Sequence, residues 1–374
     1  MGSKICLLEP TLGGGLAGHA AYARDLANWI TREHMETVTI CCRKDISPSV
    51  IKFTGETHRY LKVFSHPFQD WSVFENPAAN WRSREQLTRE MIAAIEATHH
   101  HDLQVCATAF PNFVYAALKA RRRAKRVNFL FHYSLQEHSD SHLMTEPTIL
   151  KKLQNPRDFG VYCLANNLSL AAELNELGIP TRVVPYIHYA KGPGSVSTRR
   201  QAGSLHVGIF GHQRSVKDGG LLIPLCHSLL EQGHKVTFHD SSATPAPFTH
   251  PNLTFVSGFL EPMNFSQLTS TVDLTIITNT AKGFDRAISG VCIESLANGV
   301  PCLVPANTHM SRLVHKFNAG ATYNQRSVKN IMKRISALST HYSHAADGAL
   351  LASKWLEHFG HGGANAYFDS LCQH

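Results

Sequence analysis

The sequence predicts an α/β protein of two Rossmann-like domains that face each other across a cleft. Short apolar runs, typical of buried parallel strands, alternate with amphipathic helical segments along the chain. The alternation stops in a Gly/Pro/Ser-rich stretch at 190–204 and then starts again. Two such arrays favour a first domain at 1–190 and a second at 200–350. A C-terminal helix at about 355–374 is expected to pack back on the first domain.

The composition fits two globular domains in a reducing compartment. Of the 374 residues, 43% are hydrophobic, which is enough for two buried cores. No apolar run reaches the length of a transmembrane helix, and the first residues lack the pattern of a signal peptide. Most of the nine cysteines lie inside apolar runs, where they behave as small buried side chains. We therefore expect a cytoplasmic protein.

The first array opens with a strand at 4–10, a glycine-rich loop and a helix at about 20–32. The loop residues Gly14, Gly15 and Gly18 would let the backbone approach a ligand closely, although turn chemistry explains them equally well. Their spacing is not that of the G-x-G-x-x-G dinucleotide motif. His19 at the helix start either points into a cleft or caps the helix.

The strand at 126–131 ends directly at His132. Ligands of open parallel sheets bind outside the carboxyl ends of the strands, so this histidine is better placed than most of the 24 in the chain. The remaining elements of the first array are expected as strands at 37–42, 59–64, 103–108, 161–165 and 182–185, and as helices at 83–98, 113–123 and 168–177.

The net charge of +8 is spread over both halves of the chain and favours anionic small ligands or an anionic membrane surface over nucleic acid. The run KARRRAKR at 119–126 is expected to close the helix at 113–123. It is either a solvated helix end or a contact with anionic lipid. An aromatic stretch at 64–81 is either a loop packed on its own rings, a lip over an acceptor site, or a membrane-facing loop.

The second array repeats the strand–helix alternation. Its strands are expected at 205–210, 235–239, 252–256, 274–278 and 302–304, and its helices at 221–232, 265–270, 290–298, 311–317, 328–339 and 349–371. The turn after 298 contains a glycine at a helix C-cap position and then a proline, which ends the helix.

The helix that starts at Ser289-Gly290 is the strongest candidate for a phosphate site. A helix N-terminus offers free N–H groups and a partial positive charge. Glu294 in its second turn could accept hydrogen bonds from sugar hydroxyls, or be an ordinary surface glutamate. Arg214 and Lys217, in the loop after the strand at 205–210, could clamp a diphosphate from the other side. No Asp-x-Asp motif is present to hold a metal ion.

These motifs together resemble a retaining glycosyltransferase of the GT-B type, in the broad family 4 (glycosyl transferases group 1). The glycine-rich loop resembles its acceptor-side loop, and VNFLFHYS resembles the strand that ends in its active-site histidine. FGHQRSVKDGG resembles its phosphate loop, and SGVCIESLANGVPCLVP resembles the end of its E-x7-E element. The likeness covers nearly the whole chain, and a bacterial subgroup with G-H-Q-R and S-G-V-x-x-E segments is most similar.

Three positions depart from that pattern. Arg286 stands eight residues before Glu294, where the family has a glutamate beside the donor sugar. Counting from Gly211, the usual arginine position holds His212, and the glycine that normally follows the lysine is Asp218. The lysine position itself is filled by Lys217.

The resemblance implies transfer of a sugar from a nucleoside-diphosphate sugar to an acceptor hydroxyl, with retention and with domain closure to exclude water. Arg214, Lys217 and the N–H groups at the helix start would stabilise the leaving diphosphate. His132 would contact the donor sugar or the transferring region, with His19 as the second candidate. The implied donor-binding residues are Gly211, His212, Arg286, Ser289, Gly290, Val291 and Glu294.

The resemblance implies an enzyme without cofactor or metal, whose partners are a nucleotide-sugar and a glycan or lipid-linked acceptor. Synthesis of bacterial surface glycans or glycolipids, with peripheral contact at the inner face of the membrane, is the expected context. Nucleic acid is not expected as a partner. Two alternatives stay open, a sugar-nucleotide epimerase of the same fold and a non-catalytic GT-B-like binding protein.

Overall fold

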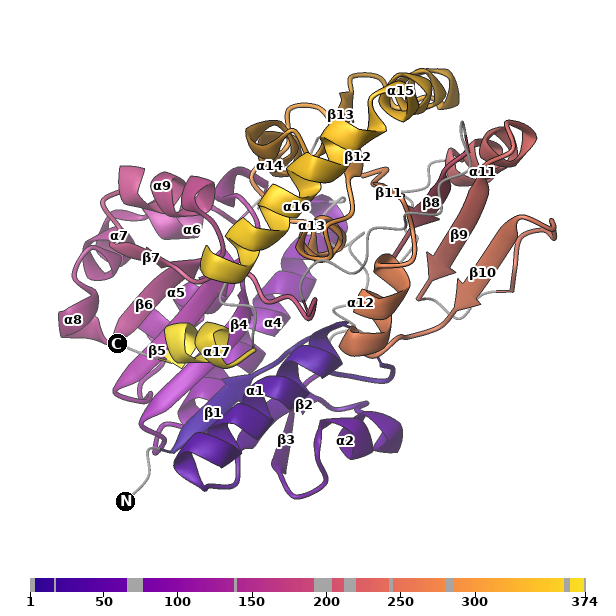
Figure 1. The fold of residues 1–374 in the computed structure, drawn as a ribbon. Coiled ribbons are helices and arrows are strands. Elements are labelled where there is room, and N and C mark those ends of the chain that lie inside the picture. Colours follow the sequence, from indigo (N-terminus) through magenta and orange to yellow (C-terminus); the bar gives the residue numbers. More distant parts are fainter. Residues whose placement is uncertain are drawn as a thin grey trace. The chain divides into compact units, whose positions relative to one another are not determined.

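The computed structural model describes residues 4–16, 18–65, 77–137, 140–191, 204–211, 220–241, 245–279, 285–359 and 364–372. The chain divides into two compact units (Figure 1). Unit 1 is formed by Met1–Pro185 together with Ala364–His374, and unit 2 by Tyr186–Gly363.

Unit 1 is built on a seven-stranded parallel sheet with the order β3-β2-β1-β4-β5-β6-β7. Its inner strands carry continuous runs of buried residues because helices cover both faces. Figure 1 shows α1 and α17 on one face and α4 and α5 on the other. The strands are β1 (Ile5–Leu8), β2 (Thr39–Arg43), β3 (Arg59–Phe64), β4 (Leu103–Ala109), β5 (Arg126–Phe131), β6 (Val161–Ala165) and β7 (Thr181–Val183).

The helices of unit 1 start where side chains or prolines satisfy the first turn. Ser47, Glu146 and Asn167 each accept an N–H from the first turn of their helix, and proline occupies the start of several helices. The helices are α1 (Gly18–His34), α2 (Pro48–Thr54), α4 (Pro77–Ala97), α5 (Pro111–Lys119), α6 (His142–Thr145), α7 (Pro147–Leu153), α8 (Pro156–Phe159), α9 (Leu168–Glu176) and α17 (Ala364–Cys372), with a short 3-10 turn at Leu135–Glu137.

The last helix, α17, completes unit 1. The buried Asn128 amide of β5 donates a hydrogen bond of 2.8 Å to the carbonyl of Leu371. Tyr367 and Phe368 are fully buried, and the Tyr367 ring packs edge-on against Tyr22 of α1 at 5.1 Å between centroids. The far C-terminal segment therefore belongs to the same core as the first strands.

Unit 2 repeats the architecture with six parallel strands in the order β10-β9-β8-β11-β12-β13. One face is covered by α11, α15 and the start of α16, and the other by α13, α14 and the rest of α16. Its elements are β8 (His206–Ile209), α11 (Leu222–Glu231), β9 (Lys235–Asp240), β10 (Leu253–Ser257), α12 (Pro262–Thr269), β11 (Leu274–Ile276), α13 (Gly290–Ala297), β12 (Cys302–Pro305), α14 (His309–Phe317), β13 (Gly320–Tyr323), α15 (Val328–Thr340) and α16 (Tyr342–Phe359).

The predicted fold class of two Rossmann-like arrays is confirmed. Several element predictions need correction. The helix expected at 113–123 ends at Lys119, so most of the basic run is the loop before β5. The single tail helix expected at 349–371 is two helices, and only the second belongs to unit 1. The helix expected at 83–98 starts earlier, inside the aromatic stretch, of which 66–76 lie outside the described residues.

Within the described ranges, four α-helices and one strand were not predicted, namely α2, α6, α7, α8 and β13. In the described part of the chain, no helix combines the length and the apolarity that crossing a bilayer requires.

Candidate functional site

The carboxyl edge of the unit 2 sheet forms a small hollow against the start of α13. The hollow lies where β8 and β11 end, and the first residues of α13 close it. Ser289 is the N-cap of this helix, and its hydroxyl accepts the N–H of Cys292 at 3.4 Å. The other N–H groups of the first turn have no partner within the helix and lie beside this hollow. The hollow is lined by Ile209, Phe210, Ile276, Ile277, Thr278, Asn279, Ser289 and Val291.

Glu294, in the second turn of α13, is buried, not a surface glutamate. Its side chain is only 5% exposed, and one oxygen, Oε2, accepts the N–H of Tyr189 at 3.1 Å. The other oxygen, Oε1, has no hydrogen-bond partner among the described residues. Burial raises the pKa of this carboxyl, and the nearby Ser266 hydroxyl and the Tyr189 N–H offset part of that rise. A buried acceptor left unpaired costs about 1–3 kcal/mol, so Oε1 is suited to a hydroxyl supplied by a ligand.

The segment that begins unit 2 packs on the start of the same helix. The hydroxyl of Tyr186 lies 2.7 Å from the place where a Cβ at position 290 would stand, which explains why this position is glycine. Burial, with the charge of Glu294 adding to it, raises the pKa of Tyr186 to about 12. Neither Tyr186 nor Tyr189 was among the predicted site residues.

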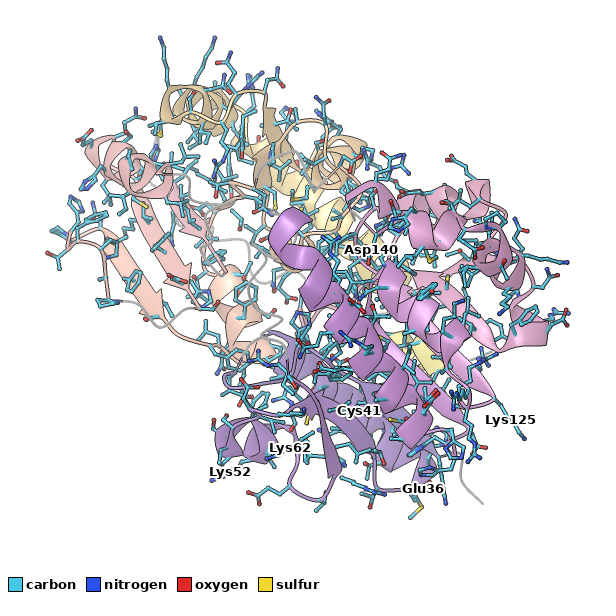
Figure 2. The ribbon with its side chains drawn as sticks, turned by 180° about the vertical axis from the view of Figure 1, so that it is seen from behind. Glu36, Cys41, Lys52, Lys62, Lys125 and Asp140 are labelled. Carbon is cyan, nitrogen blue, oxygen red and sulfur yellow. The ribbon has the colours of Figure 1, made fainter. Side chains whose placement is uncertain are left out.

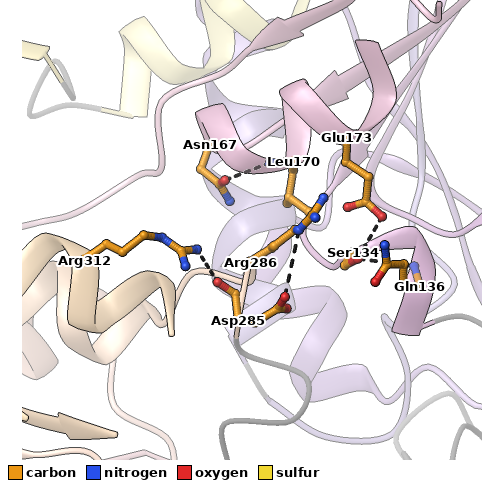
Figure 3. A network of polar contacts seen from close by, with 8 residues as sticks. All are labelled: Ser134, Gln136, Asn167, Leu170, Glu173, Asp285, Arg286 and Arg312. Carbon is orange, nitrogen blue, oxygen red and sulfur yellow. Dashed lines mark hydrogen bonds and ion pairs between the residues drawn. The ribbon is translucent and has the colours of Figure 1, made fainter. Parts of the chain in front are cut away.

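Arg286 lies on the short segment that leads into α13. Its Nε is 3.9 Å from the Asp285 carboxylate, and its side chain is 28% exposed. Arg312 of α14 donates a hydrogen bond to the Asp285 carbonyl, as Figure 3 shows. A guanidinium therefore holds the backbone just before Ser289, and the N-terminus of α13 is anchored from a second helix.

Gly211 follows the end of β8 with a φ of +100°, a conformation that side chains rarely adopt. Its N–H donates to Nδ1 of His239 at 3.3 Å, so the loop leaves the strand at a fixed point. The three predicted residues that come next, His212, Arg214 and Lys217, lie outside the described residues.

In unit 1, His132 lies directly after β5, at the carboxyl edge of the sheet. Its Nε2 donates to the carbonyl of Ala107 at 2.7 Å, and its Nδ1 accepts from the Asn166 amide at 2.8 Å. Burial lowers the pKa of His132 to about 4, so the ring is neutral near pH 7. Both ring nitrogens are therefore engaged in hydrogen bonds that orient the ring.

Ala107 is available to His132 because the pairing of β4 and β5 shifts register between Cys106 and Ala109. The N–H of Ala107 donates to the carboxyl of Glu9, which is 2% exposed and also accepts from the Thr11 hydroxyl at 3.4 Å. Burial raises the pKa of Glu9 to about 8. A buried acid and the predicted histidine thus bind the N–H and the carbonyl of one residue, a feature that sequence reasoning missed.

The glycine-rich loop belongs to the same edge. Nothing lies within 4 Å of a Cβ placed at Gly15 or Gly18, and at Gly14 the nearest atom is 3.7 Å away. These positions therefore have room for a side chain, and crowding does not explain the glycines. His19 lies in the first turn of α1, and its Nδ1 is 3.5 Å from the Thr108 hydroxyl oxygen.

The basic run lies at the opposite edge of the unit 1 sheet. A helix that follows a parallel strand returns to the amino edge, and the run stands between the end of α5 and the start of β5. Two arginines of the run make structural contacts. Arg123 donates a hydrogen bond to the Phe159 carbonyl, and the Arg126 guanidinium stacks on the Tyr162 ring. The exposed cations, one of which is labelled in Figure 2, are Lys119, Arg121, Arg122 and Lys125.

In the described ranges, no group of three or more His, Cys, Asp or Glu side chains could hold a metal ion. The residues missed by sequence reasoning, Glu9, Asn166, Tyr186 and Tyr189, act through tertiary contacts. The signal available for Glu9 was its place directly after an apolar strand. Tyr186 stands in the segment YIHY between a strand and the linker, which has no recognisable motif.

Comparisons with known proteins agree on the architecture. No family model and no curated protein matches the sequence. HepE of Anabaena, solved with UDP-glucose, matches with a TM-score of 0.64 at 16% identity, covering 99% of this chain and 98% of HepE. Sucrose-phosphate synthase of Thermosynechococcus elongatus matches with a TM-score of 0.62 at 13% identity, covering 96% of each chain.

A putative UDP-N-acetylglucosamine 2-epimerase of Listeria monocytogenes is also similar, with a TM-score of 0.59 at 11% identity over 99% of this chain and 94% of the epimerase. At these identities the likeness concerns the fold. The chain has the two Rossmann-like domains of the GT-B glycosyltransferases.

Proposed function

We propose that the protein is a glycosyltransferase that moves a sugar from a nucleoside-diphosphate sugar to an acceptor hydroxyl. The observation that carries this proposal is the buried, unpaired Oε1 of Glu294 one turn beyond the N-terminus of α13. A ribose hydroxyl would satisfy that oxygen, and a diphosphate would accept the N–H groups of the first turn. Both requirements are met by one nucleoside diphosphate.

In this proposal unit 2 binds the donor. The N–H groups at Ser289, Gly290 and Val291 face the diphosphate, and Arg214 and Lys217 supply its countercharge. Charge on the leaving diphosphate grows in the transition state, so these groups contribute to rate as well as to affinity. The site draws its positive potential from a helix and two side chains, and we propose that it works without a metal ion.

Unit 1 would provide the acceptor side. The open loop at Gly14, Gly15 and Gly18 leaves room for an acceptor, with His19, His132 and Glu9 at the same sheet edge. Near pH 7 the carboxyl and the imidazole are both neutral, because their pKa values are about 8 and about 4. A neutral environment suits a mechanism in which the leaving phosphate itself takes the acceptor proton, and it accords with the retention that we propose.

The biological setting proposed for this reaction is bacterial glycan or glycolipid synthesis in the cytoplasm, with peripheral contact at an anionic membrane. The exposed cations of the loop before β5 support the membrane contact. HepE, with which the chain shares its fold, was solved with UDP-glucose, and this makes UDP-sugars the first donors to test.

An epimerase is the second candidate, because a putative UDP-N-acetylglucosamine 2-epimerase has the same fold. Product analysis separates the two. A transferase yields a free nucleoside diphosphate and a glycoside, whereas an epimerase yields an altered sugar-nucleotide. Absence of both products despite tight nucleotide binding would favour the non-catalytic alternative.

Calorimetric titration with UDP, GDP, ADP and CMP, without metal and then with Mg²⁺, tests the donor site. We expect one diphosphate to bind tightly without metal. Lys217→Ala should weaken it by ~1.5–3 kcal/mol, because a charge-assisted hydrogen bond is lost. Lys235→Ala, at an exposed position at the start of β9, is the control and should leave affinity unchanged. Failure of all four nucleotides to bind would contradict the proposed function.

A further inference from the structure

Tyr186 packs against the N-terminus of α13, where the proposed donor diphosphate would bind. It is the first residue of this unit, and its hydroxyl lies over Gly290, the first residue of α13. A Cβ on residue 290 would stand 2.7 Å from that hydroxyl, closer than real contacts allow. The backbone of α13 and the phenol are therefore fitted to each other at the helix N-terminus.

The chemistry of the phenol at this point is that of a hydrogen-bond donor. A group whose pKa is raised to about 12 keeps its proton throughout the physiological range. Three residues later, the N–H of Tyr189 holds Oε2 of Glu294, a carboxylate that is 5% exposed and whose Oε1 is unpaired among the described residues. The segment from Tyr186 to Tyr189 thus meets α13 at the two points where a nucleoside diphosphate would bind.

We infer that Tyr186 is a donor-binding residue whose hydroxyl donates a hydrogen bond to the diphosphate held at the N-terminus of α13. Gly290 admits that hydroxyl. This inference rests on the proposed function, since it names a further contact to the same ligand. It assigns the segment before the interdomain linker to the nucleotide-sugar site.

Tyr186→Phe is the direct test, because it removes the hydroxyl and leaves the ring. Calorimetry would use whichever of UDP, GDP and ADP the wild-type protein binds most tightly, together with the corresponding nucleoside. We expect the diphosphate to bind about ten- to a hundredfold more weakly, which is the effect of one lost hydrogen bond to a charged group. The nucleoside, which lacks phosphates, should bind as it does to the wild-type protein.

Tyr342→Phe is the matched control. Its hydroxyl donates to the Asp273 carbonyl at 2.9 Å just before β11, at the amino edge of the unit 2 sheet. Loss of that bond should lower the melting temperature and leave diphosphate affinity unchanged. If folded Tyr186→Phe protein bound the diphosphate as tightly as wild type, the inference would be overturned and the proposed function would stand. If the wild-type protein bound no diphosphate, both would fall.

A second set of variants keeps the inference testable if Tyr186→Phe is unstable. Gly290→Ala places a methyl group against the hydroxyl, so it should displace the phenol and reduce diphosphate affinity severalfold. With phenylalanine at 186, the nearest remaining ring atoms lie 3.5 Å from the new methyl group, an ordinary contact. The alanine should therefore cause little further loss in the double variant. Equal losses from Gly290→Ala in both backgrounds would overturn the inference.

Discussion

Burial keeps two titratable side chains neutral at the carboxyl edge of unit 1. Glu9 accepts the N–H of Ala107 as a carboxyl with a pKa of about 8, and His132 donates to the Ala107 carbonyl as an imidazole with a pKa of about 4. The backbone of Ala107 thus lies between two neutral groups, and no ion pair between Glu9 and His132 is needed to hold it.

The acid Glu9 predicts a pH dependence of stability. The native state binds the Glu9 proton more tightly than the unfolded chain does. The stability that Glu9 contributes to the folded state is therefore fully present below about pH 4.5, and it is lost as pH rises through about 8. Glu9→Gln should remove that loss and become more stable than wild type above pH 8. The gain should not exceed ~5 kcal/mol, because the pKa rises from 4.5 to about 8 and one pKa unit corresponds to ~1.4 kcal/mol.

Urea unfolding of wild type and Glu9→Gln at pH 5 and pH 8.5 would measure this difference. Glu176→Gln, at an exposed position at the end of α9, is the control, and its difference from wild type should be the same at both pH values. Parallel curves for Glu9→Gln would show that the carboxyl is hydrated in solution.

At the residue scale, the sequence indicated which residues lie at the carboxyl edge of a sheet better than it indicated which residues they contact. His132 was found because a histidine directly follows an apolar strand, and the carboxyl end of a parallel strand is a known place for ligands. Its partners Ala107 and Asn166 come from two other strand ends, and their contact depends on a register shift that no local pattern encodes. Tyr186 was missed for the same reason, because its role depends on folding back on α13.

At the scale of elements, the attachment of α17 is the contact most open to test. Asn128→Ala removes the amide that pairs with the Leu371 carbonyl in a fully buried position. The carbonyl is then left unsatisfied, and we expect a loss of ~1–3 kcal/mol in the free energy of unfolding. Chemical denaturation would measure it.

Asn155→Ala is the matched control for that prediction. Its amide donates to the Lys151 carbonyl at the same distance, 2.8 Å, but in an exposed position where water can replace it. We expect a change within ~0.5 kcal/mol. Equal effects of the two substitutions would mean that α17 is already separated from β5 in solution.

The accuracy of the element predictions followed the strength of the local signal. Apolar strands such as β5 and β6 were placed to the residue, whereas β13, with the sequence GATY, has too few apolar residues to be recognised. Helix starts were placed late at α4, α5 and α12, each of which begins with a proline. Proline is favoured in the first turn because no N–H is needed there, and this signal was not used.

At the scale of the whole molecule, the alternation of strands and helices was sufficient for the fold class. It could not show that the chain returns to unit 1 after unit 2, since that depends on which core accepts Tyr367 and Phe368. It also could not show that the basic run is a loop. The helix there ends at Lys119, and buried alanines at 120 and 124 then carry the loop into the next strand.

The position of charge, not its total, is predicted to govern membrane contact. Replacing Arg121, Arg122 and Lys125 by glutamine should reduce cosedimentation with vesicles that contain anionic phosphatidylserine, and added salt should reduce it for wild type too. The control replaces the exposed Lys329, Lys333 and Arg334 of α15 by glutamine, which removes the same charge from unit 2. Equal losses in both variants would show that net charge alone decides.

The hydrogen bond from Asn128 to Leu371 joins residues 243 positions apart in the sequence, and this separation has a consequence during synthesis. A ribosome adds ~5–20 residues per second, so β5 emerges roughly 10–50 s before its partner exists. Throughout that interval the nascent first domain has an incomplete face. It reaches its final form only after the second domain has been translated, and any chain that stops early leaves that face open to chaperones and proteases.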